Sequence, residues 1–108
     1  FVRAAFYCAT APKLPNAIET VKQCFHVLNN FDIPIGIEHP LGKTPDMPSA
    51  THWTSVIDLS NRMVYFKTAY NSTIRCIDLN EIDFEKVKYQ SHPFDRNKEQ
   101  PIEKIFIE

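Results

Sequence analysis

A run rich in proline and glycine between residues 32 and 50 divides the chain into two parts with different hydrophobic periodicity. The run contains Pro34, Gly36, Pro40, Gly42, Pro45 and Pro48. Proline cannot donate a backbone hydrogen bond, so neither a helix nor a central strand continues through such a run. A connection of this length inside a domain is usually functional or packed on another part of the protein. The chain is therefore expected to have helices before this connection and strands after it.

The segment "NAIETVKQCFHVLNNF" predicts a helix from Asn16 to Asn30. Asn16 is a good N-cap residue, and Glu19 stands three residues later, as in a capping box. Apolar residues recur at the spacing of one buried helical stripe. The residues of this stripe are Ile18, Val21, Phe25 and Leu28.

The first ten residues, "FVRAAFYCAT", also predict a helix, from Phe1 to about Thr10. Apolar side chains begin at once and no capping residue precedes them, although the first four N–H groups of a helix need partners. Pro12 and Pro15 then end the helix. Phe1 is therefore interpreted as lying inside an element that begins upstream, so that residues 1–108 are a fragment of a larger domain.

Beyond Thr51 the hydrophobic period changes to two, which is typical of strands. Three segments rich in β-branched and aromatic residues, "THWTSVIDL", "RMVYFKTAY" and "TIRCIDL", are separated by the turns Ser60-Asn61 and Asn71-Ser72. They predict a three-stranded antiparallel meander and an α+β fold. The polar segment that follows ends in "PIEKIFIE", which is expected to form a short strand or a docking tail.

Composition excludes several classes of function. With 108 residues the chain fits one domain, and 44% hydrophobic and 23% charged residues argue against disorder of the whole chain. The net charge of −1 gives no electrostatic case for binding nucleic acid or an anionic membrane. No apolar run approaches the roughly 20 residues that cross a bilayer. No cofactor is expected.

Three cysteines, Cys8, Cys24 and Cys76, form no C-x-x-C pair. Each falls where a small buried hydrophobe would fit, and free cysteine is among the most buried residue types. They are therefore expected to be buried free thiols rather than a disulfide framework.

Histidine and acidic residues give weak signals. His26 lies on the polar side of its helix, whereas His39, His52 and His92 are scattered without the spacing of zinc ligands. The acidic residues after the third strand are interpreted as a solvated turn rather than as a catalytic carboxylate pair. These residues are Asp78, Glu81, Asp83 and Glu85.

The aromatic residues of the predicted strands are expected to form the packed faces of the sheet. They are Trp53, Tyr65, Phe66 and Tyr70. Arg3 and Arg75 are the arginines inside predicted regular elements. An arginine among apolar residues needs a specific partner, because an unpaired buried charge is costly.

Four segments in order resemble the choloylglycine hydrolase family, which includes bile salt hydrolases and penicillin V acylases. "FVRAAFY" is similar to the family pattern S-R-F-[V/L]-R-x-A-[F/Y], and "CFHVLNNFDIPIG" is similar to its helix followed by an I-P-x-G turn. "THWTSVIDLSNRMVYFKTAYNSTIRCIDL" is similar to its hairpin and following strand, and "HPFD" has a place near its C-terminus. The resemblance covers nearly the whole chain.

This resemblance implies that residues 1–108 are the C-terminal portion of an N-terminal-nucleophile hydrolase, an αββα sandwich of two sheets between helix layers. Such enzymes cleave a linear amide bond by acyl transfer to an N-terminal cysteine, whose α-amino group acts as the base. Asparagine side chains help to form the oxyanion hole, and no metal takes part. The nucleophile is expected outside this chain, so Cys8 is not its equivalent and the chain alone is expected to be inactive.

The resemblance also implies an arginine near the nucleophile, carried by the S-R-F-[V/L]-R pattern. The first arginine of this pattern would fall immediately before Phe1, and the second is Arg3. Arg3 is therefore a candidate catalytic residue, or a neighbour of one on the same helix face.

Two other hypotheses stay open. The chain could be a non-catalytic α+β binding or assembly module, or a small metal-binding domain built on His39, His52 and His92. The resemblance implies a small-molecule amide as substrate and a homo-oligomer at full length. It leaves the acyl group open, and the compartment as either bacterial cytoplasm or periplasm.

Overall fold

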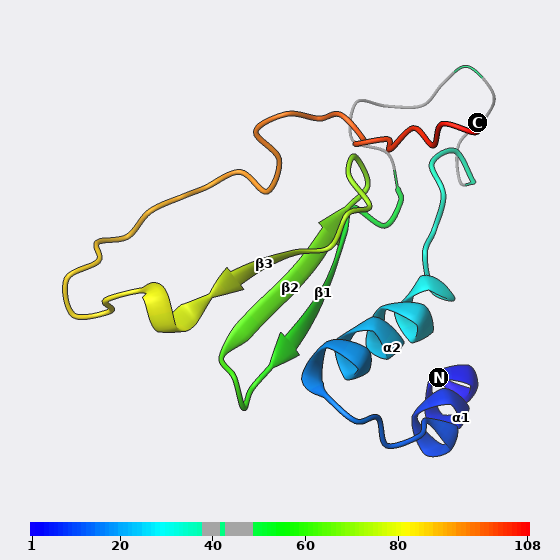
Figure 1. The fold of residues 1–108 in the computed structure, drawn as a ribbon, viewed down its shortest axis with the longest axis horizontal. Helices are drawn as coiled ribbons and strands as arrows, with labels where there is room; N and C mark the ends of the chain where they lie inside the picture. The colour runs from blue at the N-terminus through cyan, green and yellow to red at the C-terminus, as the bar shows by residue number, and fades with distance from the viewer. Residues whose placement is uncertain (38–41, 43–48) are drawn as a thin grey trace.

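The computed structural model describes residues 1–37, 42 and 49–108. It contains two helices followed by an antiparallel three-stranded sheet (Figure 1), which confirms the predicted order of elements. The elements are α1 (Val2–Thr10), α2 (Ala17–Asn29), β1 (Trp53–Asp58), β2 (Met63–Thr68), β3 (Arg75–Asp78) and the 3₁₀ helix η1 (Leu79–Glu81).

Helix α2 begins at the predicted cap and packs on the sheet. The side-chain oxygen of Asn16 accepts a hydrogen bond from the Glu19 amide at 2.9 Å, whereas the Glu19 carboxylate pairs with Lys22 at 3.2 Å. Val21 and Phe25 are buried, and they are the centre of the predicted apolar stripe. Ile18 at the start of the stripe is 54% exposed, so the buried face is narrower than its spacing predicts.

The register of the strands assigns side chains to the two faces of the sheet. Strand order is β1-β2-β3, with Val56 opposite Tyr65 and Tyr65 opposite Cys76. Because side chains alternate along a strand, this row faces α2, which shares hollows with Val56 and Lys67. The neighbouring row of Ser55, Phe66 and Arg75 lies on the opposite face.

The opposite face is covered in part by a segment from near the C-terminus. After η1 the chain runs away from the sheet and then returns to lie above it in the view of Figure 1. The Phe94 ring lies 5.0 Å from the Phe66 ring and 6.3 Å from the Trp53 ring, between centroids. Farther along, the Gln100 side chain accepts a hydrogen bond from the Ser72 amide at 2.7 Å.

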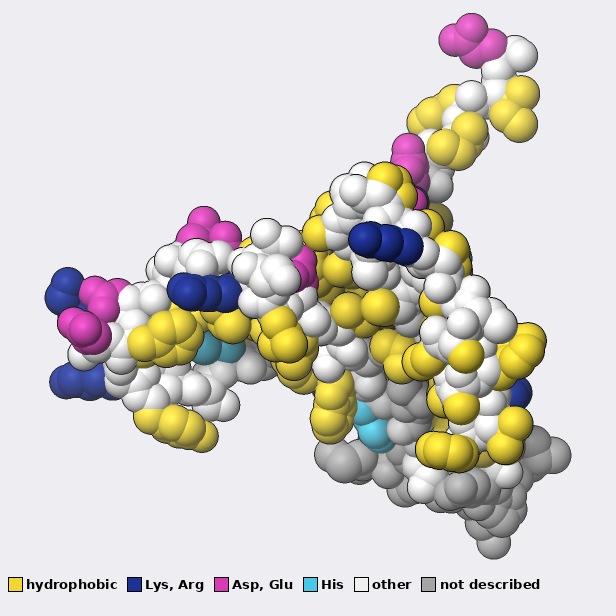
Figure 2. Space-filling view, turned by 90° about the horizontal axis from the view of Figure 1, so that it is seen from below, with side chains coloured by type: hydrophobic (Ala, Val, Ile, Leu, Met, Phe, Trp, Pro, Cys, Tyr) yellow, Lys and Arg dark blue, Asp and Glu magenta, His cyan; other side chains and the backbone are white. Residues whose placement is uncertain are grey.

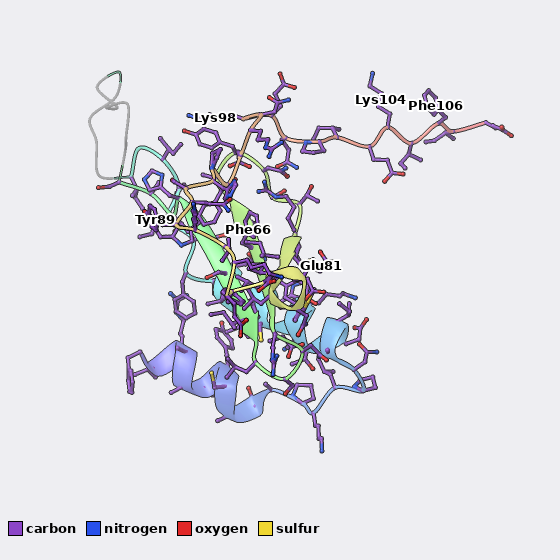
Figure 3. The ribbon with its side chains drawn as sticks, turned by 90° about the vertical axis from the view of Figure 1, so that its left-hand side faces the viewer. Phe66, Glu81, Tyr89, Lys98, Lys104 and Phe106 are labelled. Atoms are coloured by element: carbon purple, nitrogen blue, oxygen red, sulfur yellow. The ribbon has the colours of Figure 1, made fainter. Side chains whose placement is uncertain are left out.

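Residues 101–108 are extended and exposed along their whole length. They contain neither a strand nor a helix, so the short strand predicted here is wrong. Figure 3 shows Lys104 and Phe106 on this tail, well away from Phe66 on the sheet. A docking role for the tail stays a prediction.

The β1–β2 turn is longer than its sequence suggests. The sequence predicts a tight turn at Ser60-Asn61, whereas the structure has four turn residues, Leu59–Arg62. The Asp58 carboxylate accepts hydrogen bonds from the Asn61 backbone at 3.0 Å and from its side chain at 2.7 Å. Arg62 has a φ of 57°, in the left-handed region.

The chain exposes far more surface than a compact domain of its mass. Its accessible surface is 9485 Å², whereas a compact monomer of this mass would expose about 6,200 Å². Its radius of gyration is 17.3 Å, against about 13 Å for a compact domain of this length. Three apolar side chains are buried among the described residues: Val21, Phe25 and Phe66. Figure 2 shows hydrophobic side chains spread over the visible surface and out along the tail.

Two burial predictions are therefore wrong. Cys8 and Cys76 are free but exposed, and Cys24 is half-buried, so the thiols are not in a core. The strand aromatics were expected to be packed, which is confirmed for Phe66, whereas Trp53 is 59% and Tyr70 is 46% exposed. The physical reason is the same in both cases: within the described residues, no layer covers the outer side of α1 or β3, and the segment around Phe94 covers the face that carries Trp53 only in part.

Candidate functional site

Helix α1 directs Arg3 and Tyr7 toward the C-terminal end of α2. The two residues are four apart and therefore lie on one helix face. The Tyr7 hydroxyl donates a hydrogen bond to the Asn30 side chain at 3.3 Å. The Arg3 guanidinium lies 5.3 Å from the centroid of the Phe31 ring, within cation–π range, and the residue is exposed. The predicted candidate arginine thus lies where α2 ends.

A half-buried lysine, Lys67, joins this end of α2 to the sheet. The Lys67 side chain is 16% exposed, and its Nζ lies 3.3 Å from the Asp32 carboxylate. The same Nζ donates a hydrogen bond to the Asn29 side chain. Sequence reasoning missed this connection, although a lysine between Phe66 and Thr68 in a strand needs a partner for the same reason as an embedded arginine.

Next to Lys67 a groove opens at the end of β1 and β2, with a volume of about 430 Å³. We call it the end groove. It is lined by Asp32, Ile33, Pro34, Ile35, Ala50, Thr51, Trp53, Thr54, Lys67, Thr68, Ala69 and Ser72. Its two sides are tied together because the Thr51 amide donates to the Ile33 carbonyl at 3.0 Å, and the Ile33 amide donates to the Thr51 hydroxyl at 2.9 Å.

On the opposite face, Arg75 has the specific partner that its position requires. Its Nη1 donates to the Asp95 carboxylate at 2.7 Å and to the Phe94 carbonyl at 2.9 Å. The guanidinium also lies 4.8 Å from the centroid of the Phe66 ring. Among the described residues, Nε of Arg75 is the one buried side-chain polar atom without a hydrogen-bond partner.

The Thr68 hydroxyl completes this cluster and helps to set the charge of Asp95. It donates to the Asp95 carboxylate at 2.7 Å and accepts from the Asn71 amide at 3.2 Å. The Thr68 hydrogen bond, followed by the hydrogen bond and charge of Arg75, lowers the pKa of Asp95 below its usual range, against an opposing effect of burial. Asp95 is therefore an anion that fixes the C-terminal segment on the sheet.

The histidines and acidic residues are not assembled into a site. In the part of the chain that the structure describes, no group of three His, Cys, Asp or Glu side chains could hold a metal ion. His26 and His92 are exposed, and His39 lies outside the described residues. Glu81, Asp83 and Glu85 are exposed, as expected of a solvated turn. No helix among the described residues is long and apolar enough to span a membrane.

This architecture of two helices and an antiparallel three-stranded sheet is that of solved N-terminal-nucleophile hydrolases. It resembles a penicillin V acylase from Agrobacterium tumefaciens with a TM-score of 0.60 and 32% identity, over 77% of this chain and 25% of that one. It also shares the fold of a conjugated bile acid hydrolase from Clostridium perfringens, with a TM-score of 0.67 and 24% identity, over 96% of this chain and 30% of that one.

Residues 1–96 match the family of linear amide C–N hydrolases described as the choloylglycine hydrolase family, and the chain belongs to that family. A penicillin V acylase from Pectobacterium atrosepticum is 29% identical over 78% of this chain. The chain spans about a quarter of the length of that relative. The resemblance predicted from the sequence is confirmed.

Proposed function

We propose that this chain is the C-terminal portion of an enzyme that cleaves a linear amide C–N bond by acyl transfer to a cysteine. The match to the amide hydrolase family over residues 1–96 carries this proposal. The large exposed surface supports it as well, because 9485 Å² of accessible area is what a slab cut from a larger domain would show. The remaining surface would pack against the second sheet and helix layer of the sandwich.

In this proposal the nucleophile lies outside residues 1–108. A cysteine thiolate attacks the amide carbonyl carbon, the amine leaves with a proton, and water then hydrolyses the thioester. The cysteines of this chain have poor positions for such a step: Cys8 is inside α1, Cys24 is inside α2, and Cys76 is inside β3. None of them lies at the first turn of a helix.

We assign Arg3 to the margin of this reaction site. Its guanidinium is a cation near the N-terminal end of α1, and its aromatic contact is with Phe31. Because this contact occupies one side of the guanidinium, the group can bind a further partner. The family pattern places a second arginine immediately before Phe1, and Arg3 acts either as the catalytic arginine or as its neighbour on the helix. Penicillin V or a conjugated bile salt is the proposed class of substrate, and the full-length enzyme is proposed to be a homo-oligomer.

Hydrolysis by the isolated chain and by a longer protein that contains it tests the proposal. Both are assayed against penicillin V and a glycine-conjugated bile salt. The isolated 108 residues should release no amine, whereas the longer protein should. Turnover by the isolated chain, or none by a folded longer protein with either substrate, would contradict the proposal.

The same assay tests Arg3 with a matched control. In the longer protein, Arg3→Met should lower kcat/KM by about 10²-fold or more if Arg3 touches the reacting group. Arg62→Met alters another exposed arginine, in the β1–β2 turn, and should leave kcat/KM unchanged. An unchanged rate in Arg3→Met would assign the catalytic role to another residue.

A further inference from the structure

We propose that Lys67 is a positioning residue for the amide-cleaving reaction. Its ammonium group fixes the C-terminal end of α2, and this end in turn fixes the Arg3 guanidinium at the N-terminal end of α1. The inference rests on the proposed function, because Arg3 is assigned there to the margin of the reaction site. Three sets of contacts support it: those from Lys67 to the end of α2, those within this end, and those from it to α1.

Lys67 reaches from the sheet to both sides of the helix end. It lies in β2, two residues after Tyr65 and therefore on the sheet face that packs on α2. Its Nζ donates a hydrogen bond to the side chain of Asn29, the last residue of α2, and lies 3.3 Å from the carboxylate of Asp32 in the segment that follows. An ammonium group has three donors, so one side chain can hold both partners at once.

The charge and burial of Lys67 make this connection specific. The last turn of a helix leaves backbone carbonyls without partners, and a cation close to it is favourable. The Lys67 side chain is 16% exposed, so its ammonium group depends on Asp32 and Asn29 to replace lost hydration. An uncharged side chain at position 67 would leave the Asp32 carboxylate without this counter-ion, beside the negative end of α2.

Asn30 makes the end of α2 a support for α1. Its side-chain nitrogen donates to the His26 carbonyl at 3.1 Å and to the Val27 carbonyl at 3.2 Å, which closes the last turn of α2. Its side-chain oxygen accepts a hydrogen bond from the Tyr7 hydroxyl at 3.3 Å. One amide group therefore caps α2 and binds α1.

Arg3 contacts the residue that joins these two sets of contacts. The Phe31 ring lies 5.3 Å from the Arg3 guanidinium, measured to the ring centroid. Phe31 stands between Asn30, which binds α1, and Asp32, which is paired with Lys67. A shift of these three consecutive residues would therefore move the Arg3 guanidinium as well. Lys67 thus acts on Arg3 through the end of α2, without touching it.

Steady-state kinetics of the longer protein test this inference at a temperature where every variant is folded. Lys67→Met removes the ammonium group and should lower kcat by about tenfold or more, because misplacing a reacting group by about 1 Å can cost about 10²-fold. KM should change little, since the lost contacts do not involve the substrate. Lys67→Arg keeps a cation between Asp32 and Asn29 and should restore most of kcat.

Asp32→Asn breaks the same ion pair from its exposed side, so the test does not depend on the folding of Lys67→Met. It should lower kcat in the same direction. An unchanged kcat in Lys67→Met or in Asp32→Asn, or a rise in KM without a fall in kcat, would overturn the proposal.

A matched control and a double variant separate positioning from general stability. Lys22→Met removes a lysine that pairs with Glu19 at 3.2 Å near the other end of α2, and it should leave kcat unchanged. In the Arg3→Met background, Lys67→Met should lower kcat much less than in the parent protein, because the group that it positions is already gone. An equal fall in both backgrounds would show that Lys67 does not act through Arg3 and would overturn the proposal.

A spectroscopic readout separates this inference from the proposed function. The Phe31 ring current should shift the NMR signals of the Arg3 guanidinium upfield, and Arg3→Lys identifies these signals by their loss. In Lys67→Met they should move toward the position of an exposed arginine such as Arg62. This movement in a longer protein that hydrolyses neither substrate would uphold the positioning and refute the hydrolase. Hydrolysis with an unmoved Arg3 signal in Lys67→Met would do the reverse.

Discussion

At the residue scale, the Asp95 carboxylate acts as a clasp between the C-terminal segment and the sheet. It accepts hydrogen bonds from Thr68 and Arg75, both at 2.7 Å, and its side chain is 7% exposed. Charge-assisted hydrogen bonds of this kind are stronger than neutral ones. Without the clasp, the Arg75 guanidinium would remain on the sheet without an anionic partner, and Phe94 would lose its anchor on the Phe66 ring.

The lowered pKa of Asp95 predicts how this clasp depends on pH. A carboxyl group whose pKa is lower in the folded state contributes stability above its unfolded pKa of about 3.9 and loses it as the pH falls through the folded value. The Asn71 amide donates to Thr68 within the cluster, so its hydrogen exchange reports the clasp. Its protection, corrected for the intrinsic rate, should be constant from pH 7 to about pH 4 and should fall below that.

Asp95→Asn should weaken the protection of the Asn71 amide at neutral pH. In this variant the protection should no longer fall when the pH becomes acidic. The control is Asp83→Asn, which alters an exposed carboxylate paired with an exposed lysine, Lys86, at 2.9 Å. Surface pairs of this kind contribute little, so the control should follow the parent chain. If the protection of the Asn71 amide in the parent chain fell already between pH 7 and pH 5, the result would contradict the lowered pKa of Asp95.

At the element scale, local pattern was enough for the helices and strands but not for their connections. Asn16, the stripe through Val21 and Phe25, and the alternation after Thr51 predicted α2 and the meander correctly, because caps and periodicity are properties of neighbouring residues. β3 begins at Arg75 rather than Thr73. The Asn71 side chain accepts from the Thr73 amide at 2.9 Å and holds that residue in the turn.

The β1–β2 turn gives the prediction for this scale. Arg62 has a φ of 57°, and a left-handed conformation costs a residue with a Cβ about 1–2 kcal/mol, whereas glycine adopts it freely at a smaller entropic cost. Arg62→Gly should therefore stabilise the hairpin by about 0.5–1 kcal/mol, which corresponds to amide exchange about two- to fivefold slower in paired residues.

The exchange of the Met63 and Val64 amides in β2 measures this effect. Ser60→Gly is the control, because it places a glycine in the same turn at a position whose φ is not positive. It should leave exchange unchanged or make it faster, since the unfolded chain gains freedom without any relief of strain. Equal slowing in both variants would show that the conformation of Arg62 is not the cause.

At the scale of the whole molecule, the sequence indicated which faces are apolar but not what covers them. Cys8 and Trp53 lie where apolar side chains are expected, yet both are exposed, because burial depends on layers that a local pattern does not describe. The partners of Arg75 and Lys67 illustrate the same limit. The type of each residue indicated that a partner was needed, but Asp95 and Asp32 lie 20 and 35 residues away in the chain.

The excess surface predicts how the isolated chain behaves in solution. It exposes about 3,300 Å² more than a compact monomer of its mass would, and much of this area comes from apolar side chains such as Ile57, Ile77 and Phe6. The isolated chain should therefore bind a dye that reports exposed apolar surface, and it should unfold over a broad temperature range. The longer protein should bind little dye and should unfold cooperatively, because the second sheet and helix layer of the proposed sandwich would cover these faces. Dye fluorescence and thermal melting of both proteins, with the chain in denaturant as the unfolded reference, measure the difference.

The opposite result would be a sharp melting transition of the isolated chain and no increase in dye fluorescence. Its apolar faces would then be covered without further layers, and the alternative of a self-standing binding or assembly module would replace the hydrolase portion proposed here.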